Sequence, residues 1–145
     1  MKVLPTARIL IIDADADRRQ TTRTGLSALG VGAVTEVSTV EEALTLPRSF
    51  DVVVVQVQSV DDVPDHPFRD AEDAIPAVMV AEGSTLQLTR TAGRCGYDAA
   101  VGMPLLPRLL YRRIGSVLQR ARRAQRPIAA ARAAADDGEK EHAVN

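Results

Sequence analysis

The segment Asp51-Val-Val-Val-Val-Gln-Val-Gln58 predicts the centre of the fold. Four consecutive valines with little alternation of polar and apolar residues are typical of a strand buried on both faces, at the centre of a parallel sheet that helices cover. In open sheets of this kind, functional groups lie just beyond the carboxyl ends of the strands. Gln56 therefore occupies a position where a functional group is expected, and its neutral amide cannot act as a nucleophile.

Short apolar runs before and after this segment alternate with helical patterns, which predicts repeated strand–helix units in one α/β sheet. The predicted strands are 8–13, 33–37, 51–58, 77–80 and 99–102. The predicted helices run from an Asp15 or Asp17 cap to Leu29, from a Ser38 or Thr39 cap to Leu46, from a Ser84 or Thr85 cap to Gly96, and onward from Pro107. Between 59 and 75, the prolines, the acids and the lack of apolar spacing predict at most a short helix after Phe68.

The length of 145 residues and a hydrophobic content of 46% predict one domain with a sizeable core. We expect residues 1–126 to form this domain and 127–145 to form an alanine-rich and then charged tail. Pro127 should break or kink the last helix, and disorder is expected from Asp136 onward. No apolar run approaches the about 20 residues that span a bilayer, so we expect a cytoplasmic protein without membrane contact. The single cysteine, Cys95, is expected to be a buried thiol.

The net charge of −1 hides an asymmetry, because residues 1–104 carry −6 and residues 105–145 carry +5. No acid interrupts the arginines of the second part before Asp136. They are Arg108, Arg112, Arg113, Arg120, Arg122, Arg123, Arg126 and Arg132. One interpretation is nucleic-acid binding through this basic helix. The other is a solvated helix face, which the acidic body and an aromatic content of only 3% favour.

Apolar residues of the last predicted helix recur at heptad spacing. They are Leu110, Ile114, Val117, Ala121 and Ala124. Two interpretations remain open. The helix packs on the sheet with its end exposed, or these residues form a seam for a partner helix, including that of a second copy of the chain.

The strand order, the strand-end residues, the prolines at 76 and 104 and the glycine before the fifth strand resemble the receiver domain of bacterial two-component response regulators, over about 8–120. The resemblance implies a flavodoxin-like sheet of order 2-1-3-4-5 with helices on both faces. In that family an acid pair holds Mg²⁺, an aspartate accepts a phosphoryl group, and a hydroxyl and a lysine bind its oxygens. The matching positions here are Asp13 and Ala14 for the acid pair, Gln56 for the phosphoacceptor, Ala81 for the hydroxyl and Met103 for the lysine.

This degenerate phosphorylation site implies a receiver scaffold that has lost its reaction. Ala100 also replaces the family's switching aromatic residue, and the resemblance implies a cis peptide bond before Pro104. We expect no enzymatic activity, no cofactor and no metal ion. The leading hypothesis is a pseudo-receiver that acts in two-component or phosphorelay signalling without being phosphorylated, by binding a protein partner through its last strand and last helix. A flavodoxin-like enzyme or small-ligand binder near Asp13 is disfavoured, because no glycine-rich phosphate loop follows the first strand.

Overall fold

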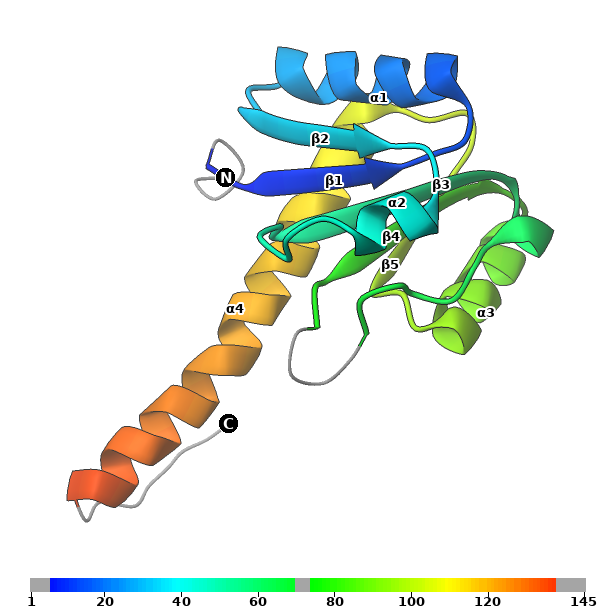
Figure 1. Ribbon diagram of the computed structural model, residues 1–145. Coiled ribbons are helices and arrows are strands. Elements are labelled where there is room, and N and C mark those ends of the chain that lie inside the picture. The colour runs from blue at the N-terminus through cyan, green and yellow to red at the C-terminus, as the bar shows by residue number, and fades with distance from the viewer. Residues whose placement is uncertain (1–5, 70–73, 138–145) are drawn as a thin grey trace.

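The computed structural model describes residues 6–69 and 74–137, with side chains up to residue 123. Five parallel strands form one sheet in the order β2-β1-β3-β4-β5. The strands are β1 (Arg8–Ile12), β2 (Ala33–Val37), β3 (Val52–Ser59), β4 (Ala77–Glu82) and β5 (Ala99–Gly102). Figure 1 shows the sheet with helices on both sides and α4 (Pro107–Asp137) projecting beyond it. The predicted fold class and strand order are confirmed.

The valine run forms the central strand. Val52, Val53 and Val54 are fully buried, and Val55 retains an exposed fraction of 2%. Successive side chains of a strand point to opposite faces, so the run contributes apolar surface to both sides of the sheet. Each fully buried valine contributes about 1.5–3 kcal/mol through the hydrophobic effect. This burial explains why an uninterrupted apolar run lies at the middle of the sheet.

Each face of the sheet has its own apolar cluster. On one face, α1 (Ala16–Ala28) and α4 pack against the strands through Leu26 and Leu110. On the other face lie α2 (Val40–Leu44) and α3 (Thr85–Cys95). The sheet is therefore the middle layer of three, and its carboxyl edge is left open between the helices.

Residues that the sequence predicts as helix caps occupy the cap positions in the structure. Asp15, Thr39 and Ser84 each accept a hydrogen bond from a backbone N–H of the first helical turn, which satisfies donors that have no partner inside the helix. Ser84 forms a reciprocal capping box with Gln87. Gly96 ends α3 with φ of 86°, a left-handed conformation that glycine adopts without strain.

The connection from β3 to β4 contains no α-helix in its described residues. A 3-10 turn, η1 (Val60–Asp62), is followed by irregular chain, and residues 70–73, where a short helix was expected, lie outside the described residues. Phe68, with an exposed fraction of 1%, fills the core beneath this segment. His66, to which the sequence assigns no role, is buried here. Its Nδ1 accepts from the N–H of Phe68 (3.0 Å), so Nε2 carries the proton that it donates to the carbonyl of Ile75 (2.7 Å).

The last helix requires two corrections. Leu110, Ile114 and Val117 are at most 2% exposed in the core between α4 and the sheet, so they are not available as a seam for a partner helix. Of the other two predicted seam residues, Ala121 is half-buried, and the side chain of Ala124 lies outside the described part.

Of the two outcomes predicted for Pro127, a break is wrong, because α4 continues to Asp137, and a kink stays a prediction. A proline inside a helix costs about 3 kcal/mol, but alanine has the highest helix propensity, and the alanine-rich sequence after Pro127 continues the helix. Asp136 and Asp137 are helical rather than disordered, while 138–145 lie outside the described residues. A domain boundary at residue 126 stays a prediction.

Candidate functional site

Three of the five predicted site residues lie together at the carboxyl edge of the sheet. Asp13 follows β1 directly, Ala14 comes next, and Gln56 lies in β3. They line a cavity of about 310 Å³ together with Ser38 and Thr39, which follow β2. At the three positions where the resemblance implies an acid pair and a phosphoacceptor, the walls carry one carboxylate, one alanine and one neutral amide, and Arg18 and Asp62 also line the cavity.

The other two predicted site residues do not line this cavity. Ala81 is fully buried in the apolar cluster beneath α2 and α3, and Met103 packs in the opposite cluster with α1 and α4. The backbone joins them, because the N–H of Met103 donates to the carbonyl of Ala81 at 3.2 Å. The peptide bond between Met103 and Pro104 is cis, as predicted. Neither side chain supplies a polar group to the carboxyl edge.

The carboxylate of Asp13 is fully engaged by α1. Arg18 donates from Nε to Oδ2 and from a terminal nitrogen to Oδ1, both at 2.6 Å, and the N–H of Asp15 donates to Oδ1 at 2.9 Å. A bidentate pair of this kind is the strongest arrangement of guanidinium and carboxylate. The hydrogen bond with Asp13 raises the pKa of Arg18 further above its usual value. The guanidinium group of Arg18 therefore stays charged at any physiological pH.

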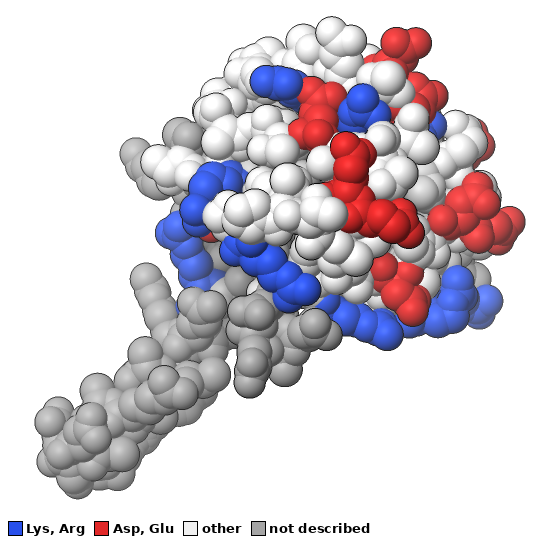
Figure 2. All heavy atoms as spheres, viewed as in Figure 1, with Lys and Arg blue, Asp and Glu red and all other residues white. Residues whose placement is uncertain are grey.

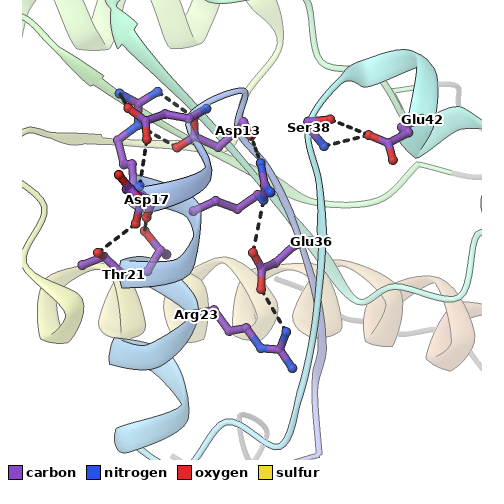
Figure 3. A network of polar contacts seen from close by, with 11 residues as sticks. Asp13, Asp17, Thr21, Arg23, Glu36, Ser38 and Glu42 are labelled. Atoms are coloured by element: carbon purple, nitrogen blue, oxygen red, sulfur yellow. Dashed lines mark hydrogen bonds and ion pairs between the residues drawn. The ribbon is translucent and has the colours of Figure 1, made fainter.

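Side chains of the first turn of α1 also form hydrogen bonds with residues of neighbouring strands. Arg18 donates to the side-chain carbonyl of Gln58 at 3.0 Å, and the amide of Gln58 donates to Glu82 at 3.3 Å. On the other side, Arg19 donates to the backbone carbonyl of Asp13 and to Glu36 of β2. Figure 3 shows the part of this network around Glu36, which lies between two arginines of α1. Hydrogen bonds to Arg23 and Arg19 lower the pKa of Glu36.

These residues do not fit the Mg²⁺ ion that the resemblance implies. Mg²⁺ demands near-octahedral oxygen coordination and is usually held by carboxylates. Here Asp13 offers one carboxylate, whose two oxygens both bind Arg18. Within residues 6–69 and 74–137, no group of three or more histidine, cysteine or acidic side chains is arranged to hold a metal ion.

The side chain of Gln56 is unusual because it is buried and its polar atoms are unpaired. The residue has an exposed fraction of 1%, and neither Nε2 nor Oε1 has a hydrogen-bond partner among the described residues. Each buried polar group left in this state costs about 1–3 kcal/mol. An amide in this position neither attacks a phosphoryl group nor stabilises the strand that carries it.

A second hollow lies between α3, β5 and α4, with a volume of about 750 Å³. Its floor is made of small residues, including Ala100, where the resemblance implies an aromatic side chain. Arg113 and Arg123 are exposed on its α4 rim, and Arg120 donates to the carbonyl of Asp98 at 3.3 Å. We name this hollow the β5–α4 groove. It combines small residues on its floor with arginines on its α4 rim.

Of the described acidic residues, only Asp98 lines this groove. Figure 2 shows acidic side chains exposed over α2, whose first turn carries Glu41 and Glu42. Arginines also lie on the body of the domain, as Arg19 and Arg23 do on α1, but α4 carries no acidic residue before Asp136. No helix in the described part of the chain is both long enough and apolar enough to cross a membrane.

Comparison with known proteins defines the fold. No protein-family model matches the sequence, and no curated protein matches it. The solved structures that resemble the chain include the chemotaxis response regulator CheY4 of Vibrio cholerae, with 20% identity and a TM-score of 0.62 over 77% of this chain and 98% of that one. A response regulator receiver domain protein from Methanospirillum hungatei has 24% identity and a TM-score of 0.61, over 81% and 98%.

The response regulator DrrB of Thermotoga maritima has 21% identity and a TM-score of 0.63, over 79% of this chain and 54% of that one. Identities of this size establish the fold and no more. The chain has the fold of response regulator receiver domains.

The residues that sequence reasoning missed are those that engage Asp13. Arg18 lies five residues after Asp13 in the first turns of α1, and Gln58 and Glu82 lie near the ends of their strands. A cation shortly after a strand-end acid was the available indication in the sequence. The contact itself depends on the angle at which α1 leaves the sheet, which spacing alone does not specify.

Proposed function

We propose that the chain is a pseudo-receiver that acts in two-component signalling without being phosphorylated, by binding a protein partner in the cytoplasm. The observation that carries this proposal is the state of the carboxyl edge, where Gln56 replaces the phosphoacceptor and the remaining acid, Asp13, is bound by Arg18. Ala81 and Met103 add no hydroxyl and no cation. The chain is not an enzyme in this proposal, and it uses no cofactor or metal.

The β5–α4 groove is the proposed contact surface. Its small-residue floor leaves room for partner side chains, and the exposed guanidinium groups of Arg113 and Arg123 favour an acidic partner surface. A homodimer through α4 is a narrower version of this proposal. It would use the helix beyond residue 118, because Leu110, Ile114 and Val117 are in the core. Light scattering of the full chain tests it, and a monomeric mass at all concentrations removes it.

Two measurements on the full chain test the main proposal. The first is the intact mass after incubation with a small-molecule phosphodonor and Mg²⁺, beside a phosphorylatable receiver domain as a control for the donor. We expect no change in mass for this chain. A stoichiometric phosphoryl adduct would refute the absence of phosphorylation.

The second measurement is capture of partners from extract of the source cell, with nuclease present. The test variant is Arg113→Glu with Arg123→Glu, and the control is Arg23→Glu, a charge reversal on α1 away from the groove. We expect a defined protein to be retained by the wild type and the control and lost by the test variant. Retention by all three would place the contact elsewhere and remove the groove from the proposal.

Nucleic-acid binding is the second candidate, and the exposed arginines of α4 favour it. They are Arg108, Arg112, Arg113, Arg120, Arg122 and Arg123. Counter-ion release makes such binding strongly dependent on salt. Recovery of nucleic acid with the chain, lost on nuclease treatment and weakened steeply by salt, would favour this candidate over a protein partner.

A further inference from the structure

We propose that Arg18 is a resident cation. Its hydrogen bonds keep divalent metal ions from binding Asp13. They also hold the side chains at the carboxyl edge of the sheet in one arrangement in the absence of any ligand. This inference rests on the proposed function, since it supplies a physical reason why the edge would not respond to a phosphoryl group or to a metal ion. It adds a residue, Arg18, that the resemblance does not assign to the site.

The first step is the saturation of Asp13. The N–H of Asp13 donates to the carbonyl of Val37, and its own carbonyl accepts from Arg19 at 2.7 Å. Its carboxylate accepts three hydrogen bonds, two from Arg18 and one from the N–H of Asp15. An incoming metal ion would therefore have to break existing bonds rather than fill a free coordination position.

The second step is burial. The side chain of Asp13 is 0% exposed and that of Arg18 is 21% exposed, so the pair is shielded from water on the carboxylate side. A buried carboxylate requires a compensating charge, and removal of one partner of such a pair is strongly unfavourable. Arg18 is covalently part of α1, so its local concentration far exceeds that of a dissolved ion. The folded chain thus provides its own counter-charge.

The third step is connection across the sheet. Arg18 bridges the end of β1 to Gln58 near the end of β3, and Gln58 continues to Glu82 at the end of β4. Arg19 extends the same system to Glu36 in β2. One helical turn therefore links the ends of four neighbouring strands through side chains of this chain alone.

The test compares the full-length wild type with Arg18→Gln, which removes the charge, and with the control Arg23→Gln. Arg23 lies on the same helix and pairs with Glu36 but not with Asp13. The probe is Mn²⁺, whose paramagnetism broadens the amide NMR resonances of nearby residues. We expect millimolar Mn²⁺ to leave Asp13 and Ala14 sharp in the wild type and the control, and to broaden both in Arg18→Gln until a chelator is added.

Amide hydrogen exchange provides a second readout of the connection. We expect exchange at Gln58 and Glu82 to be at least about tenfold faster in Arg18→Gln than in the wild type, and unchanged in Arg23→Gln. Broadening of Asp13 in the wild type would overturn the proposal, and so would unchanged exchange at both strand ends in Arg18→Gln. If Arg18→Gln does not fold, Arg18→Lys replaces it. We expect this variant, which keeps the charge but lacks the bidentate fork, to show the faster exchange without the Mn²⁺ response.

These outcomes are independent of the phosphodonor measurement. A phosphoryl adduct on the wild type refutes the proposed absence of phosphorylation, whereas Mn²⁺ binding at Asp13 without such an adduct refutes the role of Arg18 and leaves that absence standing. The two proposals therefore fail separately.

Discussion

Replacement of Gln56 by methionine should stabilise the protein. Gln56→Met keeps the length and approximate volume of the side chain and removes the two polar atoms that lack hydrogen-bond partners in the described structure. Gln56 is 1% exposed and follows the buried valines of β3, so the flexible thioether replaces an amide that is already withdrawn from water. The substitution tests directly whether the unpaired amide destabilises the folded protein.

The expected gain follows from the desolvation of the amide. A buried donor or acceptor without a partner costs about 1–3 kcal/mol, and an apolar replacement of the same shape removes that cost. Glutamine and methionine lose similar rotamer entropy on burial, so this term nearly cancels. We expect the free energy of unfolding to rise by about 1–3 kcal/mol. For a domain of this size, such a gain raises Tm by about 4–12 °C.

Urea unfolding followed by circular dichroism measures the change, and Gln58→Met provides the matched control. Gln58 is exposed and its amide is used on both sides, by Arg18 and by Glu82. Its replacement should lower stability by about 0.5–1 kcal/mol. A loss of stability in Gln56→Met equal to or larger than that in Gln58→Met would refute the reasoning, because it would mean that the buried amide is well satisfied.

Two glycine substitutions should have opposite effects. A Cβ added to Gly25 would lie 2.7 Å from Cγ of Pro107, so Gly25→Ala should lower the free energy of unfolding by about 1–3 kcal/mol. A Cβ added to Gly93 meets nothing within 4 Å, so Gly93→Ala should raise it by about 0.5–1 kcal/mol. Thermal unfolding of both variants checks this, and equal effects would contradict it. Stability should also fall in acid, because burial lowers the pKa of His66 from its usual 6.5 and the unfolded chain therefore binds the proton more readily. The stabilisation that comes from keeping His66 uncharged is complete above about pH 7. It declines as the pH falls through about 6.5 toward the lower pKa of the folded state. Denaturant titrations at several pH values should show a weaker decline in stability for His66→Gln.

The sequence predicted the sheet because its determinants are local. The valine run, the cap residues and Gly96 each specify a short element through burial, hydrogen bonding or backbone conformation, and the structure has those elements. The end of β3 differs by one residue, since the strand continues to Ser59. Only tertiary packing decides whether the apolar stripe of α4 faces the sheet or a partner, and heptad spacing alone allowed both.

The candidate site was predicted less completely than the fold. Asp13 and Gln56 were found because each lies at the carboxyl end of an inner strand. Ala81 was expected beside them, but strand alternation directs it to the same face as Met79, beneath α3. Arg18 was missed because its long side chain can reach several groups, and the choice depends on how α1 is oriented. Side-chain pairs between elements require the three-dimensional arrangement, which local sequence patterns do not contain.

The stretch 63–69 has no regular secondary structure, yet it is not a typical surface loop. His66 stacks on Tyr97 with a ring-centre separation of 5.6 Å, and the hydroxyl of Tyr97 donates to the carbonyl of Pro64 at 2.8 Å. A protease needs several residues of extended, accessible backbone, and here the side chains of His66 and Phe68 would first have to leave the interior. This stretch should therefore resist proteolytic nicking and reject inserted tags, although its irregular backbone would otherwise make it an obvious choice for either.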